Sequence, residues 1–570
     1  MKPISQKTLT FILLFLISIV AFCQDIEIVA ENGKFILDEE LNLIVCNKDV
    51  SEIDITTATT LSINLNGAVF DFSTIPNELE SGEQYLVDFN SQTYLLYFSE
   101  LALININTTE TIVDEPKVLA NFLFTDISEE PAVTTYCGIE YRGGVSQSYP
   151  KKSYDIELWD DETGEETNKM SLLNMRDDDD WLLLAMYNEP LRLRTSINHK
   201  LWREIHSPYY LNEEEDAMSG VKTKYVEIAI NNEYKGLYLL SEQVDKKQLK
   251  LKKYNGEIRG ELYKGVSWGS ANMFSSLPSY DNNEILWGGF QYKYPKPDDI
   301  IDWSNIYNFV DFVINSTDNN FETNFESKFS LDNAIDYFIF LNLLRATDNR
   351  GKNIYLAKYK ANEPYFYVPW DLDGTYGIIW NGNQENIFDD ILSNGIYNRL
   401  LNSNVSLFNQ NASNRWLELR NSDLISNVSF STKIDQVFNF LSSNGNYERE
   451  ILKWGASSID FSNLNYTYEW IGNRLDFLDV YFSSTILSVD EYLNKSEILV
   501  IPNPTATKFK LENIKKSFSY NIYNVNGLLI DTDFSQKNGF IDVTKLSKGI
   551  YFLRINGENN KYNYLKIVKN

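Results

Sequence analysis

Two groups of carboxylate and amide side chains constrain the fold more than any other feature of the sequence. They lie in residues 348–353 and 371–373 and are separated by a short stretch of chain. Within that stretch, residues 354–357 and 365–368 are rich in β-branched and aromatic side chains and enclose a polar turn. This pattern predicts the two strands of a hairpin. Because a hairpin returns the chain to its starting point, we expect the two groups to lie close together.

The spacing within these groups indicates phosphoryl transfer. In protein kinases an Asp accepts the proton of the attacking hydroxyl, and an Asn five residues later helps to hold Mg²⁺. Asp348 and Asn353 have this spacing. Asp371 is then the expected main metal ligand, and Asp373 is either a second ligand or the turn residue before Gly374. Alternatively, paired carboxylates serve as the acid and nucleophile of a glycosidase, a reaction in which the Asp-to-Asn spacing has no role.

A lysine for the phosphates is expected near residue 152. In residues 150–158, strand alternation places Lys152 on the same face as Tyr154 and Ile156, and Lys151 on the opposite face. We therefore predict that Lys152 points into the cleft as the catalytic and phosphate-binding lysine. Just before it, Arg142 and a glycine-containing turn at residues 143–148 offer a further charge and backbone N–H groups to a phosphate.

The segment from about residue 115 to about residue 485 resembles the CotH-like (spore-coat protein H) family of secreted, atypical protein kinases. The resemblance implies an α+β, kinase-like bilobal fold that uses ATP and Mg²⁺ or Mn²⁺ to phosphorylate Ser or Thr of a surface or secreted protein. It is carried by the groups around Asp348 and Asp371 and by residues 141–146, 150–156, 191–194, 232–242 and 262–265.

Two further residues follow from a kinase-like reading. Glu242 ends an apolar strand where such a fold has its lobe hinge, so we expect it to contact ribose or adenine. The glutamate that pairs with the lysine is not identified by the sequence, although Glu204 on a predicted helix is available. A run of four aspartates at residues 177–180 is interpreted as a solvated turn rather than a Ca²⁺ site.

The N-terminus predicts export. Lys2 and Lys7 precede an apolar run at residues 9–22 that is short for a membrane span and typical of a signal peptide over residues 1–24. Lipidation at Cys23 is an alternative, but Phe22 is bulky for that purpose. No later transmembrane segment is expected. The formal net charge of −29 argues against nucleic-acid partners and favours a secreted or cell-surface location.

Few residues are suited to disulfide or histidine chemistry. Only Cys46 and Cys137 remain after the signal peptide, and a bridge between them is open but not required. His199 and His206 lie on one predicted helix, where we interpret them as helix-face residues. Zinc and Ser-His-Asp chemistry are therefore not expected.

The order of predicted elements suggests five parts. After the signal peptide, residues 25–113 predict a small all-β module that spaces or adheres. Residues 114–485 begin with strands, pass through a helix at 191–206 and a hairpin turned at Asn231 and Asn232, and become helical at 331–345, 431–441 and 466–481. This is the proposed kinase domain, and residues 486–500 form a linker.

The last part, residues 501–570, begins with Pro502-Asn503-Pro504 and continues as about seven short alternating strands, which predicts a small β-sandwich. It resembles the C-terminal sorting domain of proteins exported by the type IX secretion system of Bacteroidetes. That resemblance implies handling by the type IX machinery and delivery to the cell surface.

Two functions from different classes remain open on the sequence. One is a secreted Ser/Thr kinase of the CotH-like class. The other is a catalytically weak structural or adhesive cell-surface protein on the same scaffold. The phosphoacceptor, the preferred metal and the oligomeric state are not specified by the sequence.

Overall fold

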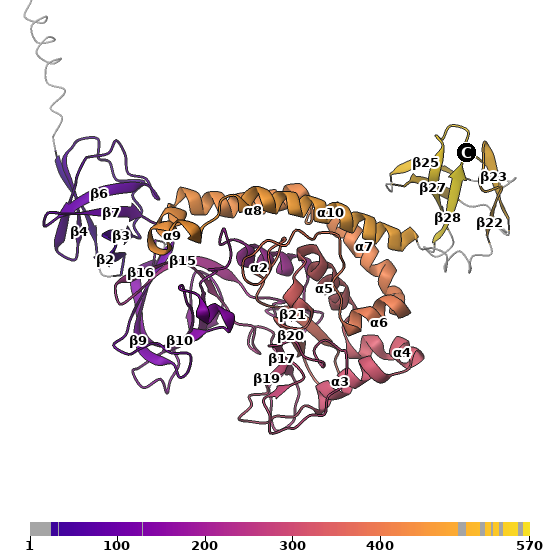
Figure 1. Cartoon of the computed structure of the whole chain (residues 1–570), viewed down its shortest axis with the longest axis horizontal. Coiled ribbons are helices and arrows are strands. Elements are labelled where there is room, and N and C mark those ends of the chain that lie inside the picture. Colours follow the sequence, from indigo (N-terminus) through magenta and orange to yellow (C-terminus); the bar gives the residue numbers. More distant parts are fainter. Residues whose placement is uncertain are drawn as a thin grey trace, which may run out of the picture. The chain divides into compact units, whose positions relative to one another are not determined.

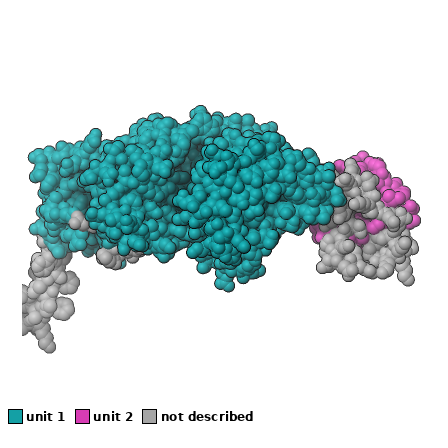
Figure 2. Space-filling model, turned by 90° about the horizontal axis from the view of Figure 1, so that it is seen from below, with its two compact units in different colours: residues 1–478 teal, residues 479–570 magenta. Residues whose placement is uncertain are grey.

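The computed structural model describes residues 24–31, 33–127, 129–487, 498–512, 519–525, 528–534, 540–556 and 562–570. The chain divides into two compact units, residues 1–478 and 479–570, which are treated separately (Figures 1 and 2). The predicted signal peptide up to residue 23 and most of the predicted linker lie outside the described residues. Within the described part, none of the helices is both long and apolar enough to cross a membrane.

The first unit starts with a seven-stranded sheet. Its order is β1-β4-β5-β6-β7-β3-β2, with β1 parallel to β4 and β3 parallel to β7. Apolar side chains on its inner face, such as Ile44, Ile63 and Leu96, form its core. The strands are β1 Gln24–Ala30, β2 Phe35–Asp38, β3 Leu43–Cys46, β4 Ala58–Leu65, β5 Ala68–Phe72, β6 Gln84–Phe89 and β7 Gln92–Phe98.

A closed barrel of order β10-β11-β14-β16-β15-β8-β9 follows. Alternate residues of every strand point inward, and Phe122, Ile156 and Trp181 are among the buried side chains that fill it. The strands are β8 Ala102–Asn107, β9 Val118–Asp126, β10 Glu129–Arg142, β11 Ser153–Trp159, β14 Asp180–Leu184, β15 Thr223–Ile230 and β16 Glu233–Ser241, with a small pair formed by β12 Met170–Ser171 and β13 Asp177–Asp178.

A five-stranded sheet and most of the helices complete this unit. The sheet order is β18-β19-β17-β20-β21. Helix α5 is buried from Asn333 to Leu344 and contacts β21, so it forms the centre of the helical part. The strands are β17 Glu261–Gly265, β18 Leu286–Trp287, β19 Phe290–Tyr294, β20 Ile354–Lys358 and β21 Tyr365–Pro369.

The helices lie mostly after the barrel in the sequence, and Figure 1 shows α8 and α10 along one edge of the unit. They are α2 Arg194–Ile205, α3 Ser304–Asn315, α4 Asp318–Lys328, α5 Leu331–Leu344, α6 Gly395–Ser403, α7 Phe408–Asn421, α8 Asn427–Ser443, α9 Asn446–Trp454 and α10 Asn463–Leu487, with 3₁₀ turns η1 Val145–Ser148, η2 Thr347–Arg350, η3 Val405–Leu407 and η4 Ala456–Ser458.

The second unit contains two sheets of orders β22-β23-β26 and β25-β24-β27-β28. Phe509, Ile522 and Leu553 belong to the core formed by the two sheets, as expected for the predicted small sandwich. The strands are β22 Leu499–Ile501, β23 Lys508–Glu512, β24 Ser519–Asn524, β25 Leu529–Phe534, β26 Phe540–Asp542, β27 Gly549–Asn556 and β28 Tyr562–Lys569.

The structure changes one expectation about organisation and answers one question that the sequence left open. Residues 102–107, which we placed in the N-terminal module, form β8 and pair with β15 and β9, so they belong to the barrel. The described residues from 24 to 99, which contain strands β1–β7, are termed the N-terminal module from here on. Cys46 and Cys137 are both free and buried, so they do not form a disulfide. The predicted hairpin at Asn231 and Asn232 is confirmed.

Candidate active site

A cavity of about 530 Å³ is lined by residues of both the barrel and the five-stranded sheet. This volume lies in the range of small-molecule sites. Figure 2 shows that this unit is hollowed on one face between two larger masses. Of the residues that we predicted to carry the chemistry, the cavity is lined by Arg142, Asp348, Asn353, Asp371 and Asp373.

The hairpin β20–β21 brings the two groups of polar residues together, as predicted. Ile354 pairs with Pro369, so Asn353 and Trp370 lie side by side at the open end of the hairpin. The Trp370 N–H donates to the Asn353 carbonyl at 3.1 Å. Asp348 lies one turn earlier, in η2. Its carboxylate lies 3.5 Å from the Lys352 ammonium.

A buried amide fixes this arrangement. The Asn349 side chain is 3% exposed and donates to the carbonyls of Asn353 at 2.8 Å and Trp370 at 2.7 Å. The Tyr337 hydroxyl donates to the Asn349 carbonyl at 2.8 Å. Asn349 therefore locks the turn that carries Asp348 to both strands of the hairpin.

Two of the predicted site residues in the cavity have a left-handed backbone. Asn353 and Asp371 both have φ of +55°. This conformation costs free energy for a residue with a side chain and is tolerated best by Asn and Asp. At these two positions the chain leaves the regular strand geometry immediately before β20 and after β21.

The two aspartates after β21 differ in their surroundings. Asp373 accepts hydrogen bonds from the Asn188 side chain at 2.5 Å and from the Gly374 N–H at 2.7 Å. Asp371 lies open to the cavity, and its carboxylate accepts no hydrogen bond from the described residues. Burial, with the neighbouring carboxylate of Asp371, raises the pKa of Asp373 well above its usual range. Desolvation also raises the pKa of Asp371, against the effect of Arg142 and Lys264.

Cations from two other elements face these carboxylates. Arg142, at the end of β10, stacks on the Trp370 ring at 5.6 Å, and Lys264 of β17 also lines the cavity. Burial, together with the charges of Arg142 and Lys293, lowers the pKa of Lys264 to about 8. Neither cation forms an ion pair with an acid of the described residues. Both positive charges can therefore act on a ligand in the cavity, although the net charge of the whole chain is strongly negative.

Of the two adjacent lysines, Lys151 lines the cavity and Lys152 does not. Lys151 is fully buried and pairs with Glu450 of α9 at 2.6 Å. Arg192 lies 3.3 Å from the other oxygen of the same carboxylate. Burial lowers the pKa of Lys151 to about 8, although Glu450 favours its charged form. Glu450 is thus the lysine-pairing acid that the sequence did not identify.

A glycine allows this pair to form. Gly236 of β16 has φ of +92°, and a Cβ there would lie 2.1 Å from the Glu450 carboxylate. The following N–H, that of Leu237, donates to Glu450 at 2.7 Å. Only a residue without a side chain lets the acid approach the strand so closely.

The predicted direction of Lys152 is wrong. Its ammonium donates to the carbonyls of Gln147 and Tyr149, both at 2.6 Å, and it does not line the cavity. The reason is that β11 begins at Ser153, so the alternation that we extended to Lys152 does not apply. Lys152 instead closes η1, which forms the second part of the predicted glycine-containing turn at residues 143–148. Gly143, Gly144 and Ser146 of that turn do line the cavity.

Glu242 is also outside the cavity lining. It is fully buried, and its carboxylate accepts from the backbone N–H of Arg176 at 3.0 Å and of Lys222 at 2.8 Å. A contact with ribose or adenine would require these bonds to break. Glu242 therefore ties loops to the end of β16. Glu204, the other acid considered, forms longer pairs with Lys200 and Lys433 near the surface.

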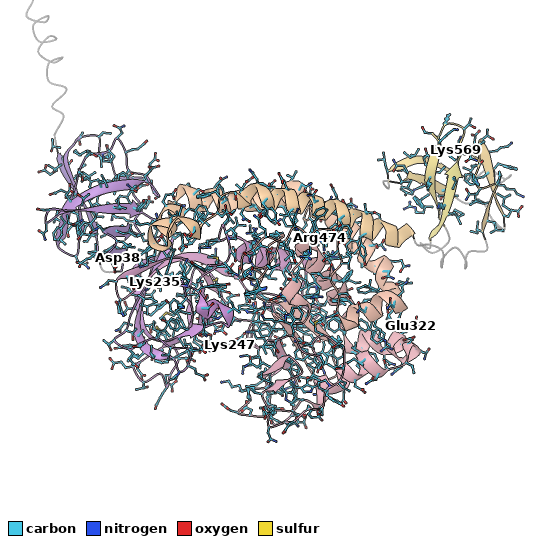
Figure 3. All side chains as sticks on the ribbon, viewed as in Figure 1. Asp38, Lys235, Lys247, Glu322, Arg474 and Lys569 are labelled. Atoms are coloured by element: carbon cyan, nitrogen blue, oxygen red, sulfur yellow. The ribbon has the colours of Figure 1, made fainter. Side chains whose placement is uncertain are left out.

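The acidic run is not a solvated turn. Asp178 and Asp179 are 1% and 6% exposed, and Lys247, labelled in Figure 3, contacts both at 2.6 Å. Arg176 also pairs with Asp178. The three acids of residues 178–180 lie close enough to share a cation, and in this structure a lysine occupies that role.

The two histidines are buried rather than placed on an open helix face. His206 contacts Asp336 at 2.9 Å and the Asn333 side chain at 3.0 Å. His199 lines the cavity beside Trp370, and neither ring nitrogen has a partner among the described residues. Burial lowers the pKa of His199 to about 3, so the ring is neutral.

The family described as CotH kinase protein matches residues 139–478. The chain belongs to this family. The match covers more than half of the chain and includes every cavity residue named above, whereas the N-terminal module precedes it. The family described as secretion system C-terminal sorting domain matches residues 499–570. A comparison with curated proteins found no match.

These matches place the CotH domain on an exported protein. The type IX sorting domain directs the chain to the cell surface or into the medium. The protein is therefore a secreted or surface member of the CotH kinase family.

Proposed function

We propose that the protein is a secreted Ser/Thr protein kinase that transfers the γ-phosphate of ATP to a surface protein. The observation that carries this proposal is the composition of one cavity. It combines a proton acceptor (Asp348), oxygen ligands (Asn353, Asp371) and cations from separate elements. Under this proposal the barrel and the helical part act as the two lobes of a kinase.

The cations suit the phosphates of ATP. Lys151 is held by Glu450 in the manner of the lysine–glutamate pair of protein kinases. Arg142 and Lys264 add charge and form no ion pair with an acid of the described residues, and the turn at Gly143 and Gly144 adds backbone N–H groups. Lys151 thus takes the role that the sequence assigned to Lys152.

The residues present also fit a divalent cation. All the candidate ligands are oxygen donors, which Mg²⁺ and Mn²⁺ prefer. Burial raises the pKa values of Asp371 and Asp373, and a divalent cation beside them would favour their charged forms. Asp371, with Asn353, would hold the cation, and Asp373 would assist from its bond with Asn188. A bound Mg²⁺ would neutralise the charge of the ATP phosphates.

Asp348 is the candidate general base. Its carboxylate is one-fifth exposed and so can be reached by a hydroxyl, and Lys352 keeps it oriented. Asp348 accepts the proton of a Ser or Thr hydroxyl while that oxygen bonds to the γ-phosphorus and the bond from phosphorus to the leaving ADP oxygen breaks. Asn349 keeps the turn fixed during this step.

The test is a transfer assay. The purified protein is incubated with γ-labelled ATP, Mg²⁺ and surface proteins of the source organism, and label on protein is followed. We expect labelled Ser or Thr with the parent and none with Asp348→Asn. The control is Asp216→Asn, because Asp216 is 89% exposed and forms only a 3.9 Å pair with Lys250. Absence of both ATP binding and transfer in the parent would favour the structural or adhesive alternative.

A further inference from the structure

The N-terminal module packs closely against the turn between α8 and α9, the helix that carries Glu450. Gly82 of the module has φ of +82°, and a Cβ there would lie 1.9 Å from the Ser443 carbonyl at the end of α8. From the other side, a Cβ on Gly445 would lie 2.5 Å from the Gly82 carbonyl. The Asp38 carboxylate accepts from the Tyr234 N–H at 2.8 Å. Asp38 is labelled between the module and the barrel in Figure 3.

A buried ion pair lies next to this contact. Glu227 of β15 and Arg449 of α9 are both fully buried and lie 2.7 Å apart. Ser99, which follows β7, donates to the Glu227 carboxylate at 2.5 Å, and Tyr234 donates to its other oxygen at 2.5 Å. Tyr97 of the module lies under the Arg449 guanidinium at 4.9 Å. Two side chains of the module therefore help to enclose this pair.

Arg449 and Glu450 are consecutive residues of one short helix. Arg449 binds Glu227 and the Asn444 carbonyl, whereas Glu450 binds Lys151 and Arg192. Since α9 spans only Asn446–Trp454, a shift of its first turn moves both side chains. The helix thus joins the module to the lysine that lines the cavity.

We infer that the N-terminal module, acting through Ser99, Glu227 and Arg449, holds Glu450 against Lys151 and so forms part of the cavity's architecture. Arg449 and Glu227 are positioning residues. The expected effect on ATP binding rests on the proposed function. The expected effect on the reactivity of Lys151 does not. It also gives the module a role other than adhesion or spacing.

Two glycines of the module provide a matched test. Gly82→Ala introduces a Cβ against α8, whereas Gly67→Ala, at φ of +93°, introduces one that meets no atom within 4 Å. Both substitutions carry a similar backbone cost. The readout is acylation of lysines by an N-hydroxysuccinimide ester, followed by peptide mass spectrometry, on the full chain without nucleotide.

We expect Gly82→Ala to raise the labelling rate of Lys151 about tenfold, because the lysine is freed from Glu450. Labelling of Lys264, which lines the same cavity without touching Glu450, should stay within about twofold. Gly67→Ala should match the parent at both lysines. Equal Lys151 labelling in the two glycine variants, or an equal rise at every lysine, would overturn the inference.

A second, milder pair of variants tests the inference even if Gly82→Ala fails to fold. Ser99→Ala removes one bond to Glu227, and Ser73→Ala removes an exposed bond to Asp88 in the same module. Only Ser99→Ala should raise Lys151 labelling, and it should weaken ATP binding threefold or more. If Lys151 responds but the parent binds no ATP, the inference holds and the proposed function fails.

Discussion

The two sides of the cavity are built by different means. On one side, termed the hairpin wall, Asp348, Asn353 and Asp371 come from neighbouring turns and are joined by the bonds of Asn349. On the other, termed the barrel wall, Lys151 is held by an acid 299 residues away. The hairpin wall leaves carboxylates open to the cavity, whereas the barrel wall pairs its lysine fully. The first can therefore take part in binding and chemistry, and the second mainly fixes a charge in place.

The largest effect is expected on the hairpin wall at Asp371. Asp371→Asn should abolish Mg²⁺-dependent ATP binding and transfer, because a neutral amide cannot supply the charge that holds the cation. Isothermal titration with ATP in the presence and absence of Mg²⁺ measures this. The control is Asp373→Asn, which keeps a side chain able to interact with Asn188 and should lose less. Normal activity in Asp371→Asn with loss in Asp373→Asn would move the metal site to the second carboxylate.

Asp348 separates binding from chemistry on the same wall. Asp348→Asn should lower turnover by roughly 10²-fold or more, the usual scale for loss of a general base, while ATP affinity stays within a few-fold. Single-turnover kinetics at saturating ATP measures the chemical step directly. A variant that binds ATP poorly but turns over normally at saturation would instead make Asp348 a ligand.

The barrel wall is tested by two adjacent lysines. Lys151→Met should weaken ATP binding by about tenfold or more and lower the free energy of unfolding by about 3 kcal/mol, because it breaks a buried ion pair. Lys152→Met should change ATP affinity by less than about twofold, since that lysine only caps η1. ATP titration and urea unfolding of both variants give the two quantities. If Lys152→Met weakens ATP binding and Lys151→Met does not, Lys152 is the phosphate-binding lysine, as the sequence predicted.

The same contrast explains what the sequence could predict. The hairpin wall depends on local patterns, so the strands β20 and β21 and the meeting of Asp348 with Asp371 followed from residue types and spacing. The Lys151–Glu450 pair joins segments that no short pattern relates. Helix α9 was not predicted, and the full burial of Arg449 and Glu450 is unusual for charged residues. Gly236 lies in residues 232–242, which were noted in the sequence, but only the approach of Glu450 explains why a glycine stands there.

Lys152 shows a second limit. The alternation rule holds only within a strand, and β11 starts one residue too late for it to apply. Lys264 shows a third: it stood in a noted motif but had no assigned role, because its position in the cavity comes from the packing of β17 against β20.

The last prediction concerns the pH dependence of ATP affinity. Lys151 and Lys264 both have a pKa lowered to about 8, so each loses its charge as the pH rises through about 8 in the free protein. Bound phosphate favours the charged form. ATP affinity should therefore fall above pH 8, by up to about tenfold per pH unit for each lysine that must gain a proton on binding. In Lys264→Met, one proton fewer should be taken up on ATP binding, so ATP affinity should fall less steeply with pH. The contribution of Lys151 should remain.

Lys246→Met is the control, because burial lowers the pKa of Lys246 as well but this lysine does not line the cavity. ATP titrations between pH 7.5 and pH 10 avoid the phosphate's own protonation, whose pKa is about 6. The parent and Lys246→Met should share one slope, and Lys264→Met should have a shallower one. If all three slopes are the same, Lys264 does not meet the phosphates, and the positive charge that binds them comes from Arg142 and Lys151 of the barrel.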